Sequence, residues 1–283
     1  MQAAFAELPL AVFTTLAPIG AASFIAFALA AFSTEYADGQ AQRIDKMSLA
    51  PFIVALVGFA ASMFHLANPL AAMGAIVGIG RSPLTNEIVV GGVFMVAALV
   101  YVVLAFTGKL AGVRKPLGAA VAVLAVVFCA FVGFAYMIPT VSSWNSALLP
   151  VEVVGYALVG GCAFGALALA GAEAEAKAAG RALRIAAVAG AVLAIVAVAA
   201  QLIALGGTTT AVASGSALAA TVAPFAVAGL ALVAVAAAEL ARGFAKGMTN
   251  AIAVRALVEV AVGAFLIRLA FYAMYMSVGV TLL

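Results

Sequence analysis

The residues whose types and spacing could do chemistry are His65, the one histidine of the 283-residue chain, and Glu87, the next acidic residue after it. His65 lies near the end of one apolar run, and Glu87 begins another. Asn68–Pro69, a short glycine-rich stretch and a polar segment at 81–87 separate the two. Ionisable residues at the joined ends of two membrane helices are costly to bury, which makes them candidates for function.

A neutral imidazole near one membrane face, with a carboxylate close by, suits the headgroup of a quinol. Quinol oxidation releases two electrons and two protons, and an imidazole accepts a proton near neutral pH. The carboxylate can pass the proton on to water. A purely structural alternative also fits, in which His65 satisfies the helix break and Glu87 caps the following helix with its negative charge.

The composition predicts an integral membrane protein. Hydrophobic residues make up 68% of the chain, charged residues 8%, and the mean hydropathy is +1.30. A soluble domain would be about a quarter charged. Apolar runs of about 20 residues predict helices rather than a barrel. The basic residues are scattered among short connections, so we expect the bilayer as a partner and no nucleic acid.

Few side chains in this sequence can hold a metal. Cys129 and Cys162 lie inside apolar runs, where they are typical small buried residues. With one histidine, they cannot supply a tetrahedral zinc site or the four ligands of an iron–sulfur cluster without extensive help from carboxylates or another chain. A bis-histidine haem needs two imidazoles, so we expect no haem unless a partner chain lends a ligand.

We predict an all-α protein with a single polytopic membrane domain over 1–283, built as two four-helix bundles. The eight predicted spans are 8–32, 50–66, 86–106, 117–137, 151–170, 185–205, 218–237 and 251–280. Proline disfavours helix, so Asn68–Pro69 should interrupt the second span. The apolar stretch 70–79 is too short to cross, and we expect it at the membrane face or packed on the bundle.

Loop charges predict the orientation. Ten basic residues lie in the connections after the first, third, fifth and seventh spans: Arg43, Lys46, Lys109, Arg114, Lys115, Lys177, Arg181, Arg184, Arg242 and Lys246. The other connections and the termini carry only Arg81. By the positive-inside rule the first set is cytoplasmic and both termini are outside. His65 then lies about 22 Å from the cytoplasmic start of its span, at the same outer depth as Glu87.

The last span carries further charges. Arg255 and Glu259 are four residues apart, so they share a helix face and can form a structural ion pair or extend to the inner interface. Arg268 has Ala264 and Tyr272 at the neighbouring helical positions, so nothing on its own helix neutralises it. It should face the bundle and bind a carboxylate, a carbonyl or a ligand oxygen, which leaves a structural and a functional role open.

Several motifs resemble the membrane-anchor subunit of dimethyl sulfoxide reductase-type complexes. They are Ser62-Met-x-His65-Leu-x-x-Pro69, Ser82-x-Leu84-Thr85-Asn86-Glu87-Ile88, Glu7-x-Pro9-Leu10-x-x-Phe13-Thr14, Thr140-Val141-x-x-Trp144 and Arg268-x-x-Phe271-Tyr272. The first is fairly specific and the others are supportive. The eight-span layout agrees, so the resemblance covers most of the chain. One departure is Ala71, where some relatives would have a basic residue.

The resemblance implies an anchor in the bacterial cytoplasmic membrane that oxidises menaquinol. The anchor would pass electrons to a four-cluster iron–sulfur subunit and a molybdopterin catalytic subunit, with no molybdenum in this chain. The family's quinol-site histidine and acidic residue fall on His65 and Glu87. Ser82, Asn86, Arg268 and Trp144 could assist them. The quinol site and the docking face would be toward the outer side, on connections 79–86, 138–149 and 206–217.

Two alternatives remain open from the sequence. A secondary transporter would need a midplane site with broken helices in both halves, and only the first half has a clear break. A quinol subunit of the polysulfide- or nitrite-reductase type would use a similar bundle. Iron–sulfur and molybdenum signals in the purified complex would favour an anchor, and solute uptake by a lone polypeptide would favour transport.

Overall fold

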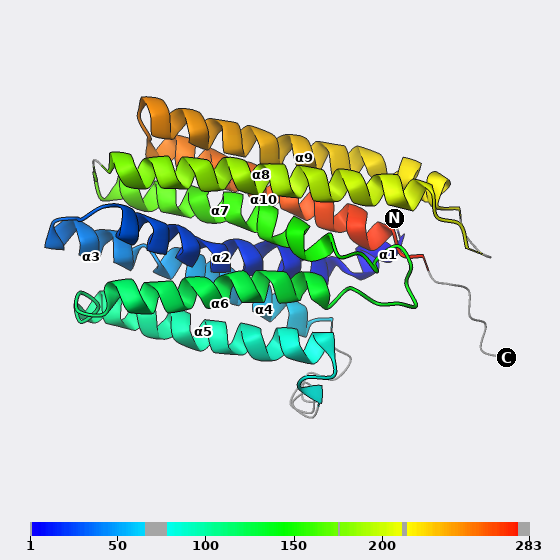
Figure 1. Ribbon diagram of the computed structural model, residues 1–283, viewed down its shortest axis with the longest axis horizontal. Coiled ribbons are helices and arrows are strands. Elements are labelled where there is room, and N and C mark those ends of the chain that lie inside the picture. The colour runs from blue at the N-terminus through cyan, green and yellow to red at the C-terminus, as the bar shows by residue number, and fades with distance from the viewer. Residues whose placement is uncertain (1, 66–77, 175, 211–213, 277–283) are drawn as a thin grey trace.

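The computed structural model describes residues 2–65, 78–174, 176–210 and 214–276 (Figure 1). Its regular structure there is helical, apart from isolated bridge residues such as the pair Thr209 and Ser214. The helices are α1 (Gln2–Ala6), α2 (Leu8–Ser33), α3 (Asp38–Lys46), α4 (Leu49–Met63), α5 (Pro83–Thr107), α6 (Arg114–Phe134), α7 (Leu149–Gly171), α8 (Lys177–Gly206), α9 (Gly215–Lys246) and α10 (Asn250–Ala273).

Seven helices of the described chain are long and apolar enough to cross a membrane: α2, a span over Gly39–Met63 that includes α4, and α5 to α9. The protein is thus all-helical, as predicted. The eighth predicted span corresponds to the 24-residue α10, and its crossing stays a prediction. The predicted break at Asn68–Pro69 and most of the stretch 70–79 lie outside the described residues, as do the last residues of the span 251–280.

Two helices extend beyond the spans predicted for them. α8 begins at Lys177 rather than 185, and α9 continues to Lys246 rather than 237. Both extensions carry basic residues, and a span predicted from hydropathy ends where such charged residues begin. The backbone remains helical there because Lys, Arg and Ala all favour helix.

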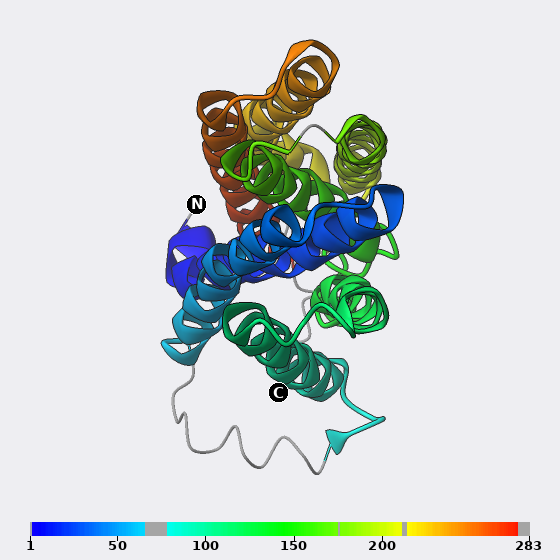
Figure 2. The same ribbon diagram turned by 90° about the vertical axis from the view of Figure 1, so that its left-hand side faces the viewer.

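α2 is the centre of the arrangement. It packs against α4 and α6 on one side and against α7, α8 and α10 on the other, so it joins the two halves of the chain (Figure 2). α5 packs on α6, and α9 packs on both α8 and α10. Small residues allow these helices to approach closely. A Cβ at Gly229 of α9 would lie 2.5 Å from the carbonyl oxygen of Gly263 in α10.

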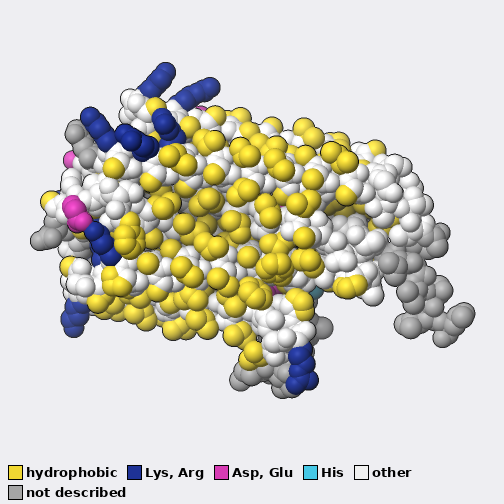
Figure 3. Space-filling model, viewed as in Figure 1, with side chains coloured by type: hydrophobic (Ala, Val, Ile, Leu, Met, Phe, Trp, Pro, Cys, Tyr) yellow, Lys and Arg dark blue, Asp and Glu magenta, His cyan; other side chains and the backbone are white. Residues whose placement is uncertain are grey.

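The surface separates into an apolar belt and a basic end. Hydrophobic side chains cover the middle of the bundle, and Lys and Arg gather at the end formed by α3 and the α5–α6, α7–α8 and α9–α10 connections (Figure 3). We call this the basic end. The opposite end holds α1, the end of α4, the start of α5 and the end of α10 (Figure 1), and we call it the histidine end because His65 follows α4.

Candidate functional site

Arg268 lies at the centre of a buried polar cluster at the histidine end. Its side chain is 0% exposed, and its Nη1 is 3.1 Å from Oε1 of Glu152. Its Nε donates to Oγ1 of Thr14 at 3.0 Å. The amide nitrogen of Gln201 donates to the second oxygen of Glu152 at 2.8 Å. The carboxylate that Arg268 was expected to bind is therefore Glu152, and the cluster ties α10 to α2, α7 and α8.

Aromatic rings enclose the guanidinium of Arg268. It lies 4.0 Å from the ring centroid of Phe271, and Trp144 stacks on that ring at 5.1 Å. The indole nitrogen of Trp144 donates to the carbonyl oxygen of Phe271 at 3.0 Å. The hydroxyl of Tyr272 donates to that of Tyr136 at 2.6 Å. Trp144 thus packs inward and fastens the α6–α7 connection to α10.

Ser82 and Asn86 organise the start of α5. The hydroxyl of Ser82 accepts the backbone N–H of Thr85 at 3.3 Å, which makes Ser82 the N-cap. The side-chain oxygen of Asn86 accepts the N–H of Gly80 at 2.8 Å. The alternative in which Glu87 caps this helix is therefore wrong, because Glu87 lies one turn further in.

Glu87 is 3% exposed, yet one of its carboxyl oxygens, Oε1, has no hydrogen-bond partner among the described residues. The charge of Arg268 lies within electrostatic range of Glu87 but pairs with Glu152 instead. Burial of a carboxyl group without a donor is costly, so such a group calls for an explanation. A ligand hydroxyl is the kind of donor that this oxygen lacks.

His65 contacts an acid other than the one that follows it. Its Nδ1 is 3.0 Å from Oε2 of Glu7, the residue directly before α2. The two atoms lie within ion-pair distance, but their geometry is not that of an aligned hydrogen bond. The side chains are 39% and 27% exposed. The imidazole is thus held from one side and remains accessible.

The packing of α4 on α5 determines where His65 and Glu87 lie along the axis of the bundle. A Cβ at Gly91 would meet the ring of Phe59 at 2.8 Å, which aligns these two positions. His65 is six residues beyond Phe59, and Glu87 is four residues before Gly91 on the antiparallel neighbour. Both therefore lie on the same side of the contact, toward the histidine end.

Sequence reasoning missed the partners Glu152, Gln201 and Glu7 as site residues. A signal was present, because Glu152 is the one acid in its apolar run and Gln201 the one amide in its own. The predicted pair of Arg255 and Glu259 is wrong. Arg255 reaches across to Glu239 of α9, 3.1 Å away.

Among the described residues, no three His, Cys, Asp or Glu side chains come together as a metal site. Cys129 and Cys162 are free thiols, both buried.

These features define a helical integral membrane protein with a buried charge cluster and an accessible histidine–acid pair at one end. The chain belongs to the family of DMSO reductase anchor subunits (DmsC), whose family model matches residues 1–274.

Three relatives agree with this assignment. The protein is 31% identical over 171 residues to the C chain of anaerobic dimethyl sulfoxide reductase from Escherichia coli (strain K12), which is 60% of each protein. It is 27% identical over 149 residues to the corresponding C chain from Haemophilus influenzae, 52% of this protein and 53% of the relative. It is 30% identical over 141 residues to the YnfH chain of anaerobic dimethyl sulfoxide reductase from E. coli, 50% and 49% of the two proteins. The match thus spans about half to three fifths of each relative.

Proposed function

We propose that this chain is the membrane anchor that binds and oxidises menaquinol and passes electrons to the iron–sulfur subunit of a molybdopterin reductase complex. Family membership supports the anchor role. The single observation that carries the quinol assignment is the combination of an accessible imidazole, His65, with a buried, unpartnered carboxyl oxygen of Glu87 at the same end of the bundle.

His65 and Glu87 are the residues that would hold the quinol headgroup. Menaquinol supplies two electrons and two protons. His65 accepts a proton from a headgroup hydroxyl, because a neutral imidazole is a base near neutral pH. The contact of Nδ1 with Glu7 orients the ring and leaves the other ring nitrogen for this task. Glu87 accepts a hydrogen bond from the ligand and relays a proton.

Ser82, Asn86, Arg268 and Trp144 support the site through their own partners. Ser82 and Asn86 shape the start of α5, on which Glu87 lies. Arg268 and Trp144 hold α10 against α7 and the α6–α7 connection. We infer that these four residues position the site and do not touch the quinol.

The orientation follows from the basic end. By the positive-inside rule this end is cytoplasmic, so the histidine end faces out of the bacterial cytoplasmic membrane. The iron–sulfur subunit then docks on 79–86, 138–149 and 206–217, close to the quinol. Protons from the quinol are released outward. The anchor itself holds no haem, no iron–sulfur cluster and no molybdenum.

The test of the quinol site is His65→Ala in the assembled complex. We expect quinol-linked turnover to fall by about 100-fold or more, the usual loss on removal of a general base. Reduction of the terminal substrate with an artificial dye donor should stay normal, since it bypasses the anchor. Wild-type quinol turnover in this variant would refute the assignment.

The test of the orientation is labelling of single cysteines at Thr140, Asn145 and Ala147, which are exposed in the α6–α7 connection. We expect an impermeant thiol reagent to label them from the outside only, and only after the partner subunit has been removed. Ala178→Cys, exposed at the basic end, is the matched control and should react from the cytoplasm. The native Cys129 and Cys162 are buried and should stay silent. The reverse pattern would overturn the orientation and the docking face together.

A further inference from the structure

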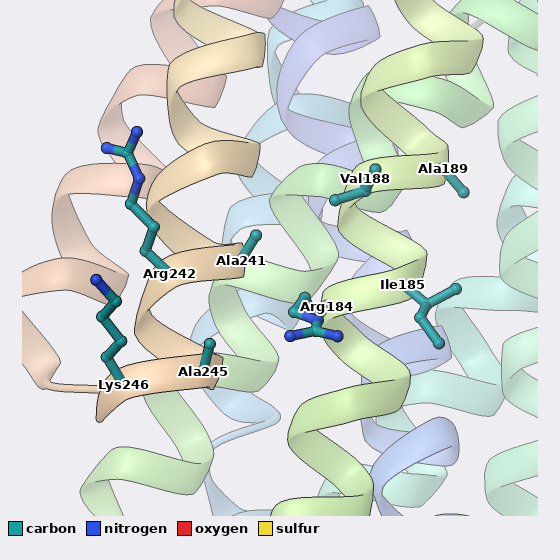
Figure 4. Close-up of a pocket in the computed structure, with 8 residues that line it drawn as sticks. All are labelled: Arg184, Ile185, Val188, Ala189, Ala241, Arg242, Ala245 and Lys246. Atoms are coloured by element: carbon teal, nitrogen blue, oxygen red, sulfur yellow. The ribbon is translucent and has the colours of Figure 1, made fainter.

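A groove of about 580 Å³ lies between α8 and α9 at the basic end (Figure 4). Three of its lining residues are basic, and none is acidic. The basic residues are Arg184 on α8 and Arg242 and Lys246 on α9. The groove is far from the histidine end, so the proposed quinol site does not account for it.

The floor of the groove is apolar and shallow. Ala241 and Ala245 are turned toward α8, and Val188 lies across from them (Figure 4). The small alanine side chains leave a channel between the two helices. Exposed Val192 and Val196 continue along α8 from the groove toward the middle of the bundle. This surface faces the region that hydrocarbon chains occupy in a membrane.

The basic side chains at the groove are exposed and have no acidic partner. Among the described residues, neither Arg184, Arg242 nor Lys246 forms an ion pair, whereas Arg255 and Lys115 each have one. Arg184 lies between α8 and α9, whereas the Arg242 and Lys246 side chains extend along the far side of α9 (Figure 4). Exposed basic side chains without an acidic partner attract an anion. Guanidinium groups bind phosphate with two parallel hydrogen bonds.

We propose that this groove binds an anionic phospholipid of the cytoplasmic leaflet. The phosphate lies at Arg184, with Arg242 and Lys246 at the edge, and an acyl chain lies over the alanine floor and along α8. Basic pockets between membrane helices near the cytoplasmic face are suited to such headgroups. A free phosphate shares the headgroup chemistry but has no acyl chain to contact the apolar floor.

The test uses the full-length chain, purified and delipidated in detergent, with phosphatidylglycerol added in steps. Binding raises the midpoint of thermal unfolding, which yields an apparent affinity. We expect Arg184→Gln/Arg242→Gln to weaken this affinity by about 10-fold or more. The matched control Arg43→Gln/Lys109→Gln removes two exposed positive charges from the same end and should stay within about twofold of the wild type.

Further arms identify the ligand. Ala245→Leu fills the exposed floor without a change of charge and should weaken binding of phosphatidylglycerol, even if the double variant folds poorly. Phosphatidylcholine and inorganic phosphate should each fail to raise the midpoint. Equal losses in the test and control variants would overturn the proposal, because they would indicate general surface attraction. An equal effect of inorganic phosphate that is insensitive to Ala245→Leu would also overturn it, as would a lipid-free dimer that buries the groove in native mass spectra.

Discussion

Two acid–base pairs at the histidine end of the bundle differ in almost every property. Arg268 and Glu152 are 0% and 2% exposed, and further donors and acceptors surround them. His65 and Glu7 are 39% and 27% exposed and form one contact. Arginine keeps its charge in proteins, whereas histidine changes charge near neutral pH. The first pair is therefore suited to holding helices together and the second to moving protons.

Glu87 combines features of both pairs. It is buried like Glu152, but one of its oxygens lacks a partner in the described structure. Burial by itself does not separate a structural acid from a functional one. The role proposed for Glu87 therefore rests on its unpartnered oxygen and not on its burial.

The largest expected effect comes from Arg268→Met. Loss of one partner of a buried ion pair leaves the other charge uncompensated, so the free energy of unfolding should fall by about 3–5 kcal/mol. Arg255→Met is the control, because the Arg255 side chain is 62% exposed. It should lower the free energy of unfolding by about 1 kcal/mol or less. Denaturation in detergent measures both. Arg268→Met/Glu152→Leu should recover much of the stability, because apolar side chains can replace a buried pair.

A different result for Arg268→Met would change the role assigned to Arg268. If Arg268→Met were as stable as the wild type but had lost quinol-linked turnover, Arg268 would be a ligand group rather than a structural one.

The second expected effect separates the two buried acids. Glu87→Gln should lower quinol-linked turnover by about tenfold, because an amide cannot relay the proton. Its free energy of unfolding should change by no more than about 1 kcal/mol, since no protein partner is lost. Glu152→Gln is the matched control and should instead destabilise the fold by about 3 kcal/mol, since it leaves Arg268 without its counter-charge. Equal destabilisation by both changes would abolish the distinction between the two acids.

The smallest expected effect concerns Glu7→Gln. Glutamine keeps the size of the side chain but removes its negative charge, so His65 should keep its orientation only in part, and turnover with a quinol should fall by about threefold. Glu35→Gln is the control at the basic end, where the hydrogen bond from Lys115 lowers the pKa of the exposed Glu35 carboxyl. Its turnover should match the wild type. An unchanged rate in Glu7→Gln would show that the contact with His65 has no role in orienting the ring.

The sequence determined the helical character and most helix positions, because an apolar run of about 20 residues is a local property of the chain. The family motifs, which are also local, singled out His65, Glu87 and Arg268. α8 and α9 extend beyond the predicted spans, since basic residues continue each helix past its apolar run.

The partners of these residues were decided only by the tertiary structure. Arg268 meets Glu152 across 116 residues of sequence, and His65 meets Glu7 rather than the acid that follows it. Helical spacing predicts neighbours within one helix, which is why it paired Arg255 with Glu259 and missed Glu239. Which helices pack together, and at what register, depends on close contacts between distant small residues such as Gly229 and Gly263. No local pattern encodes those contacts, so the charge pairs that depend on them appear only in the folded chain.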